Sequence, residues 1–113
     1  MIKSVNKKEF DELFTKDENK IINIIGKNCI IKFSAEWCQP CKFMTPILEK
    51  ISNEQDISIF KVDTDEEFEL AQLFNIRSIP TIYFIPVNGE PKHHVGAMSQ
   101  SQIEKLIQKY FGE

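Results

Sequence analysis

Cysteine and long apolar runs are scarce in this sequence, and each scarcity excludes a class of protein. Three cysteines among 113 residues are too few for the disulfide scaffold of a small secreted domain. Residues 1–8 lack the apolar core of a signal peptide, so we expect a reducing, cytoplasmic location. No apolar stretch suits a membrane span. The net charge of -3 argues against a nucleic-acid partner.

What is present indicates one globular domain over residues 1–113. Apolar residues make up 42% of the chain, with nine phenylalanines, while 27% of residues are charged. At this length, folding buries about two-thirds of the surface of the unfolded chain, which is enough for one sheet-centred core. We find no repeats, linkers or low-complexity tracts.

The most informative stretch is residues 30–42. An apolar run rich in β-branched residues is followed by two cysteines three apart, Cys38 and Cys41, and then by apolar residues at helical spacing. If the helix begins near Cys38, its sulfur lies over unpaired backbone amides at the positive end of the helix dipole, which favours the nucleophilic thiolate. Cys41, one turn later, is near enough to close a reversible disulfide with it.

This stretch carries a family resemblance. Residues 37–42, Trp-Cys-Gln-Pro-Cys-Lys, resemble the thioredoxin active site, which usually reads Trp-Cys-Gly-Pro-Cys-Lys. Val62-Asp63, residues 74–81 and residues 95–97 match further thioredoxin signatures in the same order. The resemblance therefore covers most of the chain from residue 30 onward. It implies a thiol-disulfide oxidoreductase with the thioredoxin fold.

The element pattern agrees with an α/β fold. Apolar runs predict a short edge strand at residues 2–5, a central buried strand at 29–34, a strand at 57–62 and a hairpin of 81–85 with 90–95. Capping pairs predict helices after Asn6, Thr64 and Ser99, and the helix that follows Cys38 should extend to about residue 53. The result is a central mixed β-sheet flanked by helices on both faces.

Residues 15–28 are the hardest to assign. A polar run at 16–20 precedes the apolar residues 21–25, and this pattern fits a short helix or a strand equally well. We expect a helix, because Asp17 can cap it and Gly26 can end it.

Two thiols suffice for the chemistry, so we expect no metal and no organic cofactor. Cys38 would attack a partner disulfide to form a mixed disulfide, and Cys41 would then release the reduced partner.

The alternative interpretations of the two cysteines are a pair of core cysteines or half of a zinc site. Two cysteines beside Trp37 at a helix start are poorly placed for burial. A structural zinc needs about four ligands. The remaining ligand candidates lack suitable spacing: Cys29, His93 and His94.

The resemblance also implies a surface for substrates. It gives a cis Ile79-Pro80 bond facing the cysteines, where the Ile79 backbone can pair with an extended substrate segment. From the residues alone an ordinary proline at a strand start is the better interpretation, since only about one X-Pro bond in twenty is cis. For Trp37, core packing is the alternative. The apolar rim on which partners would dock comprises Trp37, Pro40, Ile79, Gly96 and Ala97, with Gly96 allowing a close backbone approach.

Two departures from the family pattern concern redox tuning. Gln39 replaces the usual glycine before Pro40, in the dipeptide that sets the reduction potential in this family. Lys32 stands where thioredoxins usually have a buried aspartate. The lysine that accompanies this aspartate in the family would fall near Ile59 of this chain. If Lys32 faces the helix that carries the cysteines, its cation would favour their thiolates and make the protein a stronger oxidant.

Our functional hypothesis is a monomeric disulfide reductase. Its partners would be disulfide-bearing proteins and an electron-donor reductase such as a thioredoxin reductase. One alternative is an oxidant or isomerase in an oxidising compartment. The other is a protein-binding module of the same fold that grips partners through the Pro80 rim, with incidental redox chemistry.

Overall fold

The computed structural model of the protein describes residues 2–17, 20–23 and 25–112, and the side chains of these residues other than 15–17 and 20–22. The secondary-structure elements follow the chain in this order: β1 (Ile2–Ser4), α1 (Lys7–Leu13), β2 (Phe14–Asp17), β3 (Lys20–Asn23), β4 (Cys29–Ser34), α2 (Gln39–Glu54), β5 (Ser58–Asp63), α3 (Phe68–Leu73), β6 (Thr81–Ile85), β7 (Lys92–Val95) and α4 (Gln100–Phe111).

The main sheet is mixed, as predicted. Its strand order is β1-β5-β4-β6-β7, with β1, β5 and β4 parallel and with β6 antiparallel to both β4 and β7. Strand β4 lies at the centre and is buried along nearly its whole length. This agrees with its continuous apolar run, because a strand covered on both faces does not alternate between apolar and polar residues.

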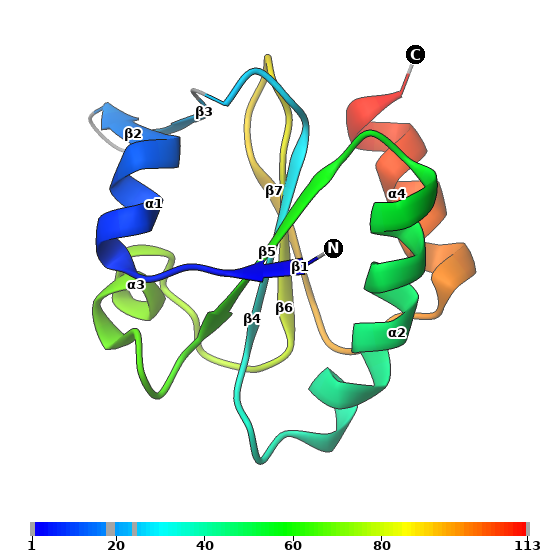
Figure 1. Cartoon of the computed structure of the whole chain (residues 1–113), viewed down its shortest axis with the longest axis horizontal. Coiled ribbons are helices and arrows are strands. Elements are labelled where there is room, and N and C mark those ends of the chain that lie inside the picture. The colour runs from blue at the N-terminus through cyan, green and yellow to red at the C-terminus, as the bar shows by residue number, and fades with distance from the viewer. Residues whose placement is uncertain (1, 18–19, 24, 113) are drawn as a thin grey trace.

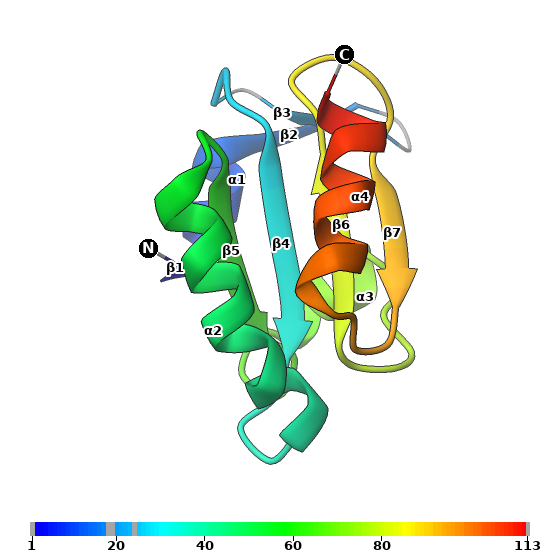
Figure 2. The same cartoon turned by 90° about the vertical axis from the view of Figure 1, so that its right-hand side faces the viewer.

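Helices cover both faces of this sheet (Figures 1 and 2). Helices α1 and α3 lie on one face, and α2 and α4 lie on the other. Alternate residues of β4 divide between the two layers. Ile31 and Phe33 belong to the core beneath α1 and α3, whereas Ile30 belongs to the core beneath α2 and α4.

Three of the predicted helix starts have local causes that the sequence shows. Asn6 caps α1, and its side chain accepts a hydrogen bond from the Glu9 backbone at 2.8 Å. Ser99 caps α4 in the same way through the backbone of Gln102. Cys38 is the N-cap of α2, and this helix continues to Glu54 with Pro46 inside it.

The helix expected after Asp17 is wrong. Strands β2 and β3 form an antiparallel hairpin there, with Phe14 opposite Asn23; residues 18, 19 and 24 lie outside the described part of the chain. Phe14 is buried in the aromatic core, and the Asn23 side chain accepts a hydrogen bond from the Ile25 backbone, which turns the chain. Gly26, with φ +83°, lies in a bend rather than at a helix end.

The capping box expected at Thr64 and Glu67 is also wrong. Helix α3 begins at Phe68 without a side-chain cap. The Thr64 hydroxyl donates to the Ser34 carbonyl at 3.2 Å. The Asp63 carboxylate accepts hydrogen bonds from the backbone amides of Asp65 and Glu66. A turn anchored by Asp63 therefore takes the place of the first helical turn.

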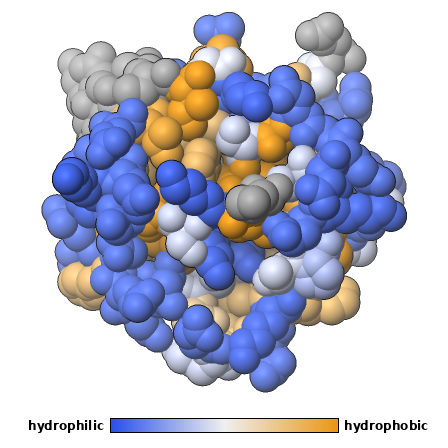
Figure 3. All heavy atoms as spheres, in the orientation of Figure 1, coloured by the Kyte–Doolittle hydropathy of each residue, from blue (hydrophilic) through white to orange (hydrophobic). Residues whose placement is uncertain are grey.

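The visible face of the molecule in Figure 3 is mostly hydrophilic over the helices, with hydrophobic atoms gathered in the middle, over the sheet. None of the helices in the described part of the chain is long and apolar enough to cross a membrane.

Candidate functional site

The two cysteines lie where the central strand passes into α2. Cys38 and Cys41 form a disulfide, with their Cα atoms 5.3 Å apart. The Cys38 sulfur also accepts a hydrogen bond from the Cys41 backbone amide at 3.2 Å. As the N-cap, Cys38 lies over the free amides and the positive dipole end of a 16-residue helix. This confirms the predicted helix start and provides the setting that stabilises a thiolate once the bond is reduced.

Both cysteines are more buried than expected. Cys38 is 4% exposed and Cys41 is 1% exposed. Neither belongs to the two core clusters of the domain, because both lie beyond the end of β4 rather than between sheet and helix. Pro40, in the first turn of α2, lacks an amide hydrogen at a position where the helix offers it no partner. The predicted dithiol pair therefore lies against the end of the fold, with Gln39 and Pro40 exposed above it.

Trp37, by contrast, is on the surface. It is 68% exposed, which corrects the alternative that it packs in the core. Its indole nitrogen donates a hydrogen bond of 2.8 Å to the Asp65 carboxylate. Asp65 stands in the turn that the Asp63 side chain holds. The sequence pattern gave no sign of Asp65 as the residue that orients Trp37, since the two are 28 positions apart.

The remaining predicted substrate residues lie at the same end of the sheet. The Ile79-Pro80 bond is cis, as the resemblance implied. Antiparallel pairing of β4 with β6 puts Phe33 opposite Thr81, so Pro80 lies beside the end of β4 that leads to Cys38. Gly96 follows β7 at this end, and its amide donates to the Pro80 carbonyl at 2.8 Å.

Gly96 is needed for its backbone conformation. Its φ of +102° lies in the region that favours glycine, and a Cβ atom added there would meet nothing within 4 Å. The expected close approach at Gly96 concerns the backbone of a partner, so it stays a prediction. Ala97, next to it, is exposed, and Ile79 is half-buried.

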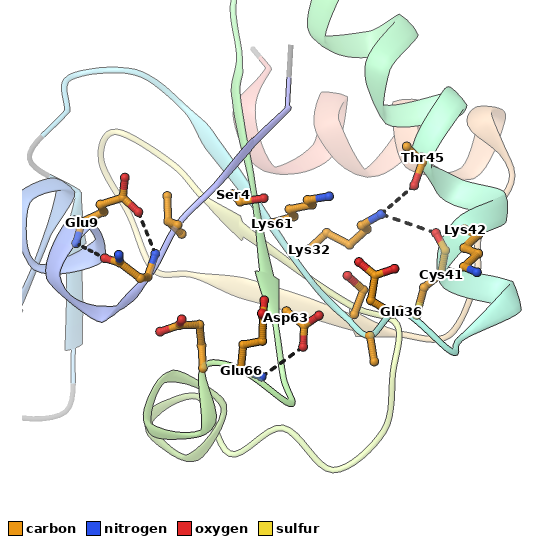
Figure 4. A pocket seen from close by; sticks show the side chains of 15 residues that line it. Ser4, Glu9, Lys32, Glu36, Cys41, Lys42, Thr45, Lys61, Asp63 and Glu66 are labelled. Atoms are coloured by element: carbon orange, nitrogen blue, oxygen red, sulfur yellow. Dashed lines mark hydrogen bonds between the residues drawn. The ribbon is translucent and has the colours of Figure 1, made fainter.

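Lys32 lies on the face of β4 beneath α2. Its side chain is buried, and its Nζ donates to the Thr45 hydroxyl at 3.0 Å and to the Cys41 carbonyl at 3.4 Å (Figure 4). Burial is the main cause that lowers the pKa of the Lys32 amine, and the charge of Lys61 lowers it further. Parallel register puts Lys61 directly opposite Lys32, and Ile59 opposite Ile30. Lys32 thus lies on the face that its expected effect on the cysteines requires. The expectation that Ile59 occupies the position of the companion lysine is wrong, because the strand register puts Lys61 next to Lys32.

A polar cavity of about 360 Å³ opens beside this lysine pair. Cys41 and Lys32 both line it, together with the acidic residues Glu36, Asp63 and Glu66. The cavity extends from Cys41 towards α1, where Asn6 and Glu9 line it. The cavity gives the buried side of the disulfide polar surroundings, whereas the two hydrophobic cores are apolar.

The third cysteine lies elsewhere. Cys29 begins β4 at the opposite end of the strand, fully buried, and its thiol contacts the Lys27 carbonyl. Burial raises the pKa of the Cys29 thiol to about 11. Within the described residues, no three His, Cys, Asp or Glu side chains are grouped so that they could hold a metal ion.

Comparison with known proteins gives concordant matches. The thioredoxin family model matches residues 1–109. The chain is 46% identical over 85 residues to a thioredoxin of Borreliella burgdorferi, covering 74% of this chain and 73% of that protein. It is 36% identical over 108 residues to an H-type thioredoxin of Oryza sativa subsp. indica, covering 95% and 84%. The solved thioredoxin structure from Malassezia sympodialis is 29% identical, with a TM-score of 0.76, and covers 97% of this chain and 90% of that chain.

Proposed function

Because this chain belongs to the thioredoxin family of thiol-disulfide oxidoreductases, we propose that it works in the reducing direction, on disulfides of other proteins. The observation that carries the proposed disulfide exchange is the Cys38–Cys41 pair at the start of α2. The helix dipole and the free amides at this position favour the thiolate that attacks a partner disulfide.

The proposed cycle uses the two sulfurs in different roles. The Cys38 thiolate attacks one sulfur of the partner disulfide, and the other partner sulfur leaves as a thiolate. Cys41 then attacks Cys38 within the mixed disulfide and releases the second partner sulfur. The cysteine at the helix start is assigned the first attack because it holds the N-cap, whereas Cys41 is almost fully buried in the first turn.

We assign partner docking to the apolar rim around Cys38. Trp37 offers a large exposed ring fixed by Asp65, and Pro40 is exposed beside it. Across the cysteines, the Ile79 backbone would pair with an extended partner segment, as in strand addition. The residues of this docking surface are Trp37, Pro40, Ile79, Pro80, Gly96 and Ala97.

Redox tuning is assigned to three residues. Gln39 and Pro40 set the conformation of the short ring that the disulfide closes, and Lys32 places an amine beneath it. In its charged form Lys32 would stabilise both thiolates and thereby raise the reduction potential. This observation favours a second candidate, an oxidant or isomerase of the same fold.

The setting that fits the reducing direction is the cytoplasm. There, residues 1–113 would act as one monomeric domain that an electron-donor reductase, such as a thioredoxin reductase, keeps reduced. The proposed reaction needs no metal or organic cofactor, because thiolate exchange moves the electrons directly between sulfurs. It also needs neither a nucleic acid nor a membrane.

The reduction potential decides between the two directions. We would equilibrate the protein with glutathione buffers and follow the reduced fraction by the fluorescence of Trp37, the single tryptophan. A potential near about −270 mV supports the reductase, whereas one near about −180 mV or above supports the oxidant or isomerase. The Gln39→Gly variant, measured alongside, tests whether this dipeptide tunes the value.

A further inference from the structure

Lys32 is the only buried lysine among the described residues, and its amine lies beside Cys41. Lys32 is 3% exposed, with its Nζ aimed at the first two turns of α2. Its two hydrogen-bond acceptors are neutral, the Thr45 hydroxyl and the Cys41 carbonyl. Neither contact supplies the negative charge that normally accompanies a buried lysine.

Several elements around Lys32 carry charged side chains. Strand β6 does not, because it places Ile82 opposite Lys32. Lys61 is the nearest in register, and its charge acts against that of Lys32. Carboxylates line the shared cavity, but among the described residues none of them hydrogen-bonds the Lys32 amine. The titratable groups lining the cavity are Lys61 and Asp63 from β5, Glu36 from the loop after β4, Lys42 and Cys41 from α2, Glu66 and Glu67 before α3, and Glu9 from α1.

We propose that the Lys32 amine, held by Thr45, is the base that takes the proton of the Cys41 thiol when Cys41 attacks the mixed disulfide. The role rests on the cycle proposed above and adds a third residue to it. Two observations carry it: the amine reaches the turn of α2 that bears Cys41, and both residues line one polar cavity of about 360 Å³. A cavity of this size and polarity can hold the water that would link the amine to the sulfur.

The step balances without any other reactant. The Cys41 thiol gives its proton to the neutral Lys32 amine, and the resulting thiolate attacks the Cys38 sulfur. The bond between Cys38 and the partner sulfur breaks, and its electron pair leaves on the partner thiolate. Cys38 and Cys41 are oxidised to a disulfide, and the partner is reduced. The Lys32 ammonium then loses its proton to solvent through the cavity.

A base must be neutral before it can act, and the surroundings of Lys32 favour the neutral form. Burial and the facing charge of Lys61 both lower the pKa of the Lys32 amine. The role therefore predicts that resolution of the mixed disulfide accelerates as pH rises through the pKa of Lys32. The first attack, by Cys38, should not follow this titration.

The test separates the two steps in one experiment. Reduced protein is mixed with 2-hydroxyethyl disulfide, a small uncharged probe, and quenched with acid at short times. Intact mass then counts the reduced, mixed-disulfide and oxidised forms. The first step is the loss of the reduced form, and the second is the conversion of the mixed disulfide. A parent protein that never forms the mixed disulfide or the oxidised form would overturn the cycle itself rather than the role of Lys32.

The decisive variants are Lys32→Arg and Lys32→Met. Arginine keeps a cation but cannot accept a proton, whereas methionine removes both the charge and the base. We expect both to slow the second step about 100-fold near neutral pH, and to slow it far more than the first. A second step that stays at the parent rate in Lys32→Arg would overturn the proposal, because a purely electrostatic role survives that change.

Two exposed positions provide variants that leave Lys32 in place. Lys61→Met removes the charge that opposes Lys32, so the pH profile of the second step should move to higher pH. The same change in the Lys32→Met protein should move nothing. Thr45→Val removes the hydroxyl that holds the amine and should slow the second step several-fold. An equal shift of the profile by Lys61→Met with and without Lys32 would contradict the proposal.

Discussion

The two faces of the central sheet differ in what they bury, although one strand supplies both. Beneath α1 and α3, a group of aromatic rings packs together, with the Phe33 ring edge to face against Tyr83 and tilted by 51° against Phe74. Beneath the first turns of α2, the neighbouring residue Lys32 places an amine next to a polar cavity. Adjacent residues of β4 thus face a packed aromatic core on one side and, in our proposal, act in the chemistry of the cysteines on the other.

The difference shows where this fold buries polar side chains. The face under α2 and α4 is as apolar as the other along most of its length, where Ile30, Met44 and Leu48 are fully buried. Among the described residues of this face, the buried charged side chain is that of Lys32, close to Cys41. A thiol that must gain and lose a proton needs such surroundings, since a fully apolar pocket would disfavour its thiolate.

The largest expected effect separates the thiols at the two ends of β4. Cys38→Ser should abolish the reduction of a disulfide-linked test protein by a small dithiol, because the nucleophile is gone. Cys29→Ser, the matched control, should leave turnover unchanged, since that thiol is buried away from the site. Turnover is followed by the appearance of free thiols. Full activity in Cys38→Ser would instead favour the binding module.

Next in size is the contrast in stability between adjacent residues of β4. Phe33→Ala should lower the free energy of unfolding by about 3 to 5 kcal/mol, because it empties a packed aromatic site. Lys32→Met should raise the urea midpoint, because it removes a buried cation without a charged partner. Destabilisation by both changes would mean that Lys32 is a packing residue like Phe33.

The stability that Lys32→Met gains over the parent protein should depend on pH. A lysine whose pKa is lowered in the folded state costs stability at neutral pH, and this cost fades as pH rises towards the ordinary value of 10.5. Urea unfolding of both proteins from neutral to alkaline pH should show the gap narrowing. A constant gap would indicate that the charge of Lys32 is not the cause.

Cys29 should give the opposite dependence on pH. Its pKa is raised from 9.0 to about 11 in the folded state, so its stabilising contribution is complete below pH 9 and is lost as pH rises through 11. The loss attributable to Cys29 amounts to about 2 to 3 kcal/mol. Cys29→Ala should unfold with a correspondingly flatter alkaline limb, measured as the urea midpoint against pH. Equal slopes in the two proteins would contradict this account.

The smallest expected effects are those of the two helix caps on opposite faces of the sheet. Asn6→Ala and Ser99→Ala each remove a side-chain acceptor for a backbone amide at a helix start. Each should cost about 1 kcal/mol in the free energy of unfolding. Thermal unfolding measures both. A loss confined to one variant would show that the caps on the two faces are not equivalent.

These caps also show which parts of the molecule the sequence predicts well. Asn6 with Glu9 and Ser99 with Gln102 act within four residues, so a local rule finds them. The same rule failed at Thr64, because its hydroxyl bonds a carbonyl of the neighbouring strand. Only the three-dimensional arrangement reveals such a competitor.

The hairpin of β2 and β3 was missed for a related reason. Apolar residues at 21–25 fit helical and strand spacing equally, and pairing with the preceding segment decides between them.

At the functional site, residues 37–42 predicted the disulfide, and the family resemblance predicted the cis bond before Pro80. The surroundings of Lys32 were not predictable, because Thr45 and Lys61 reach it through helix packing and strand register.

The most direct test of the central claim is to trap the mixed disulfide. The Cys41→Ser protein, reduced and then mixed with a disulfide-bearing protein, should accumulate a covalent complex, because Cys38 can still attack but nothing resolves the adduct. Proteolysis and mass spectrometry identify the linked cysteine. The account predicts linkage at Cys38 and its complete loss in the Cys38→Ser, Cys41→Ser double variant. Linkage at Cys29, or a complex that survives in the double variant, would contradict it.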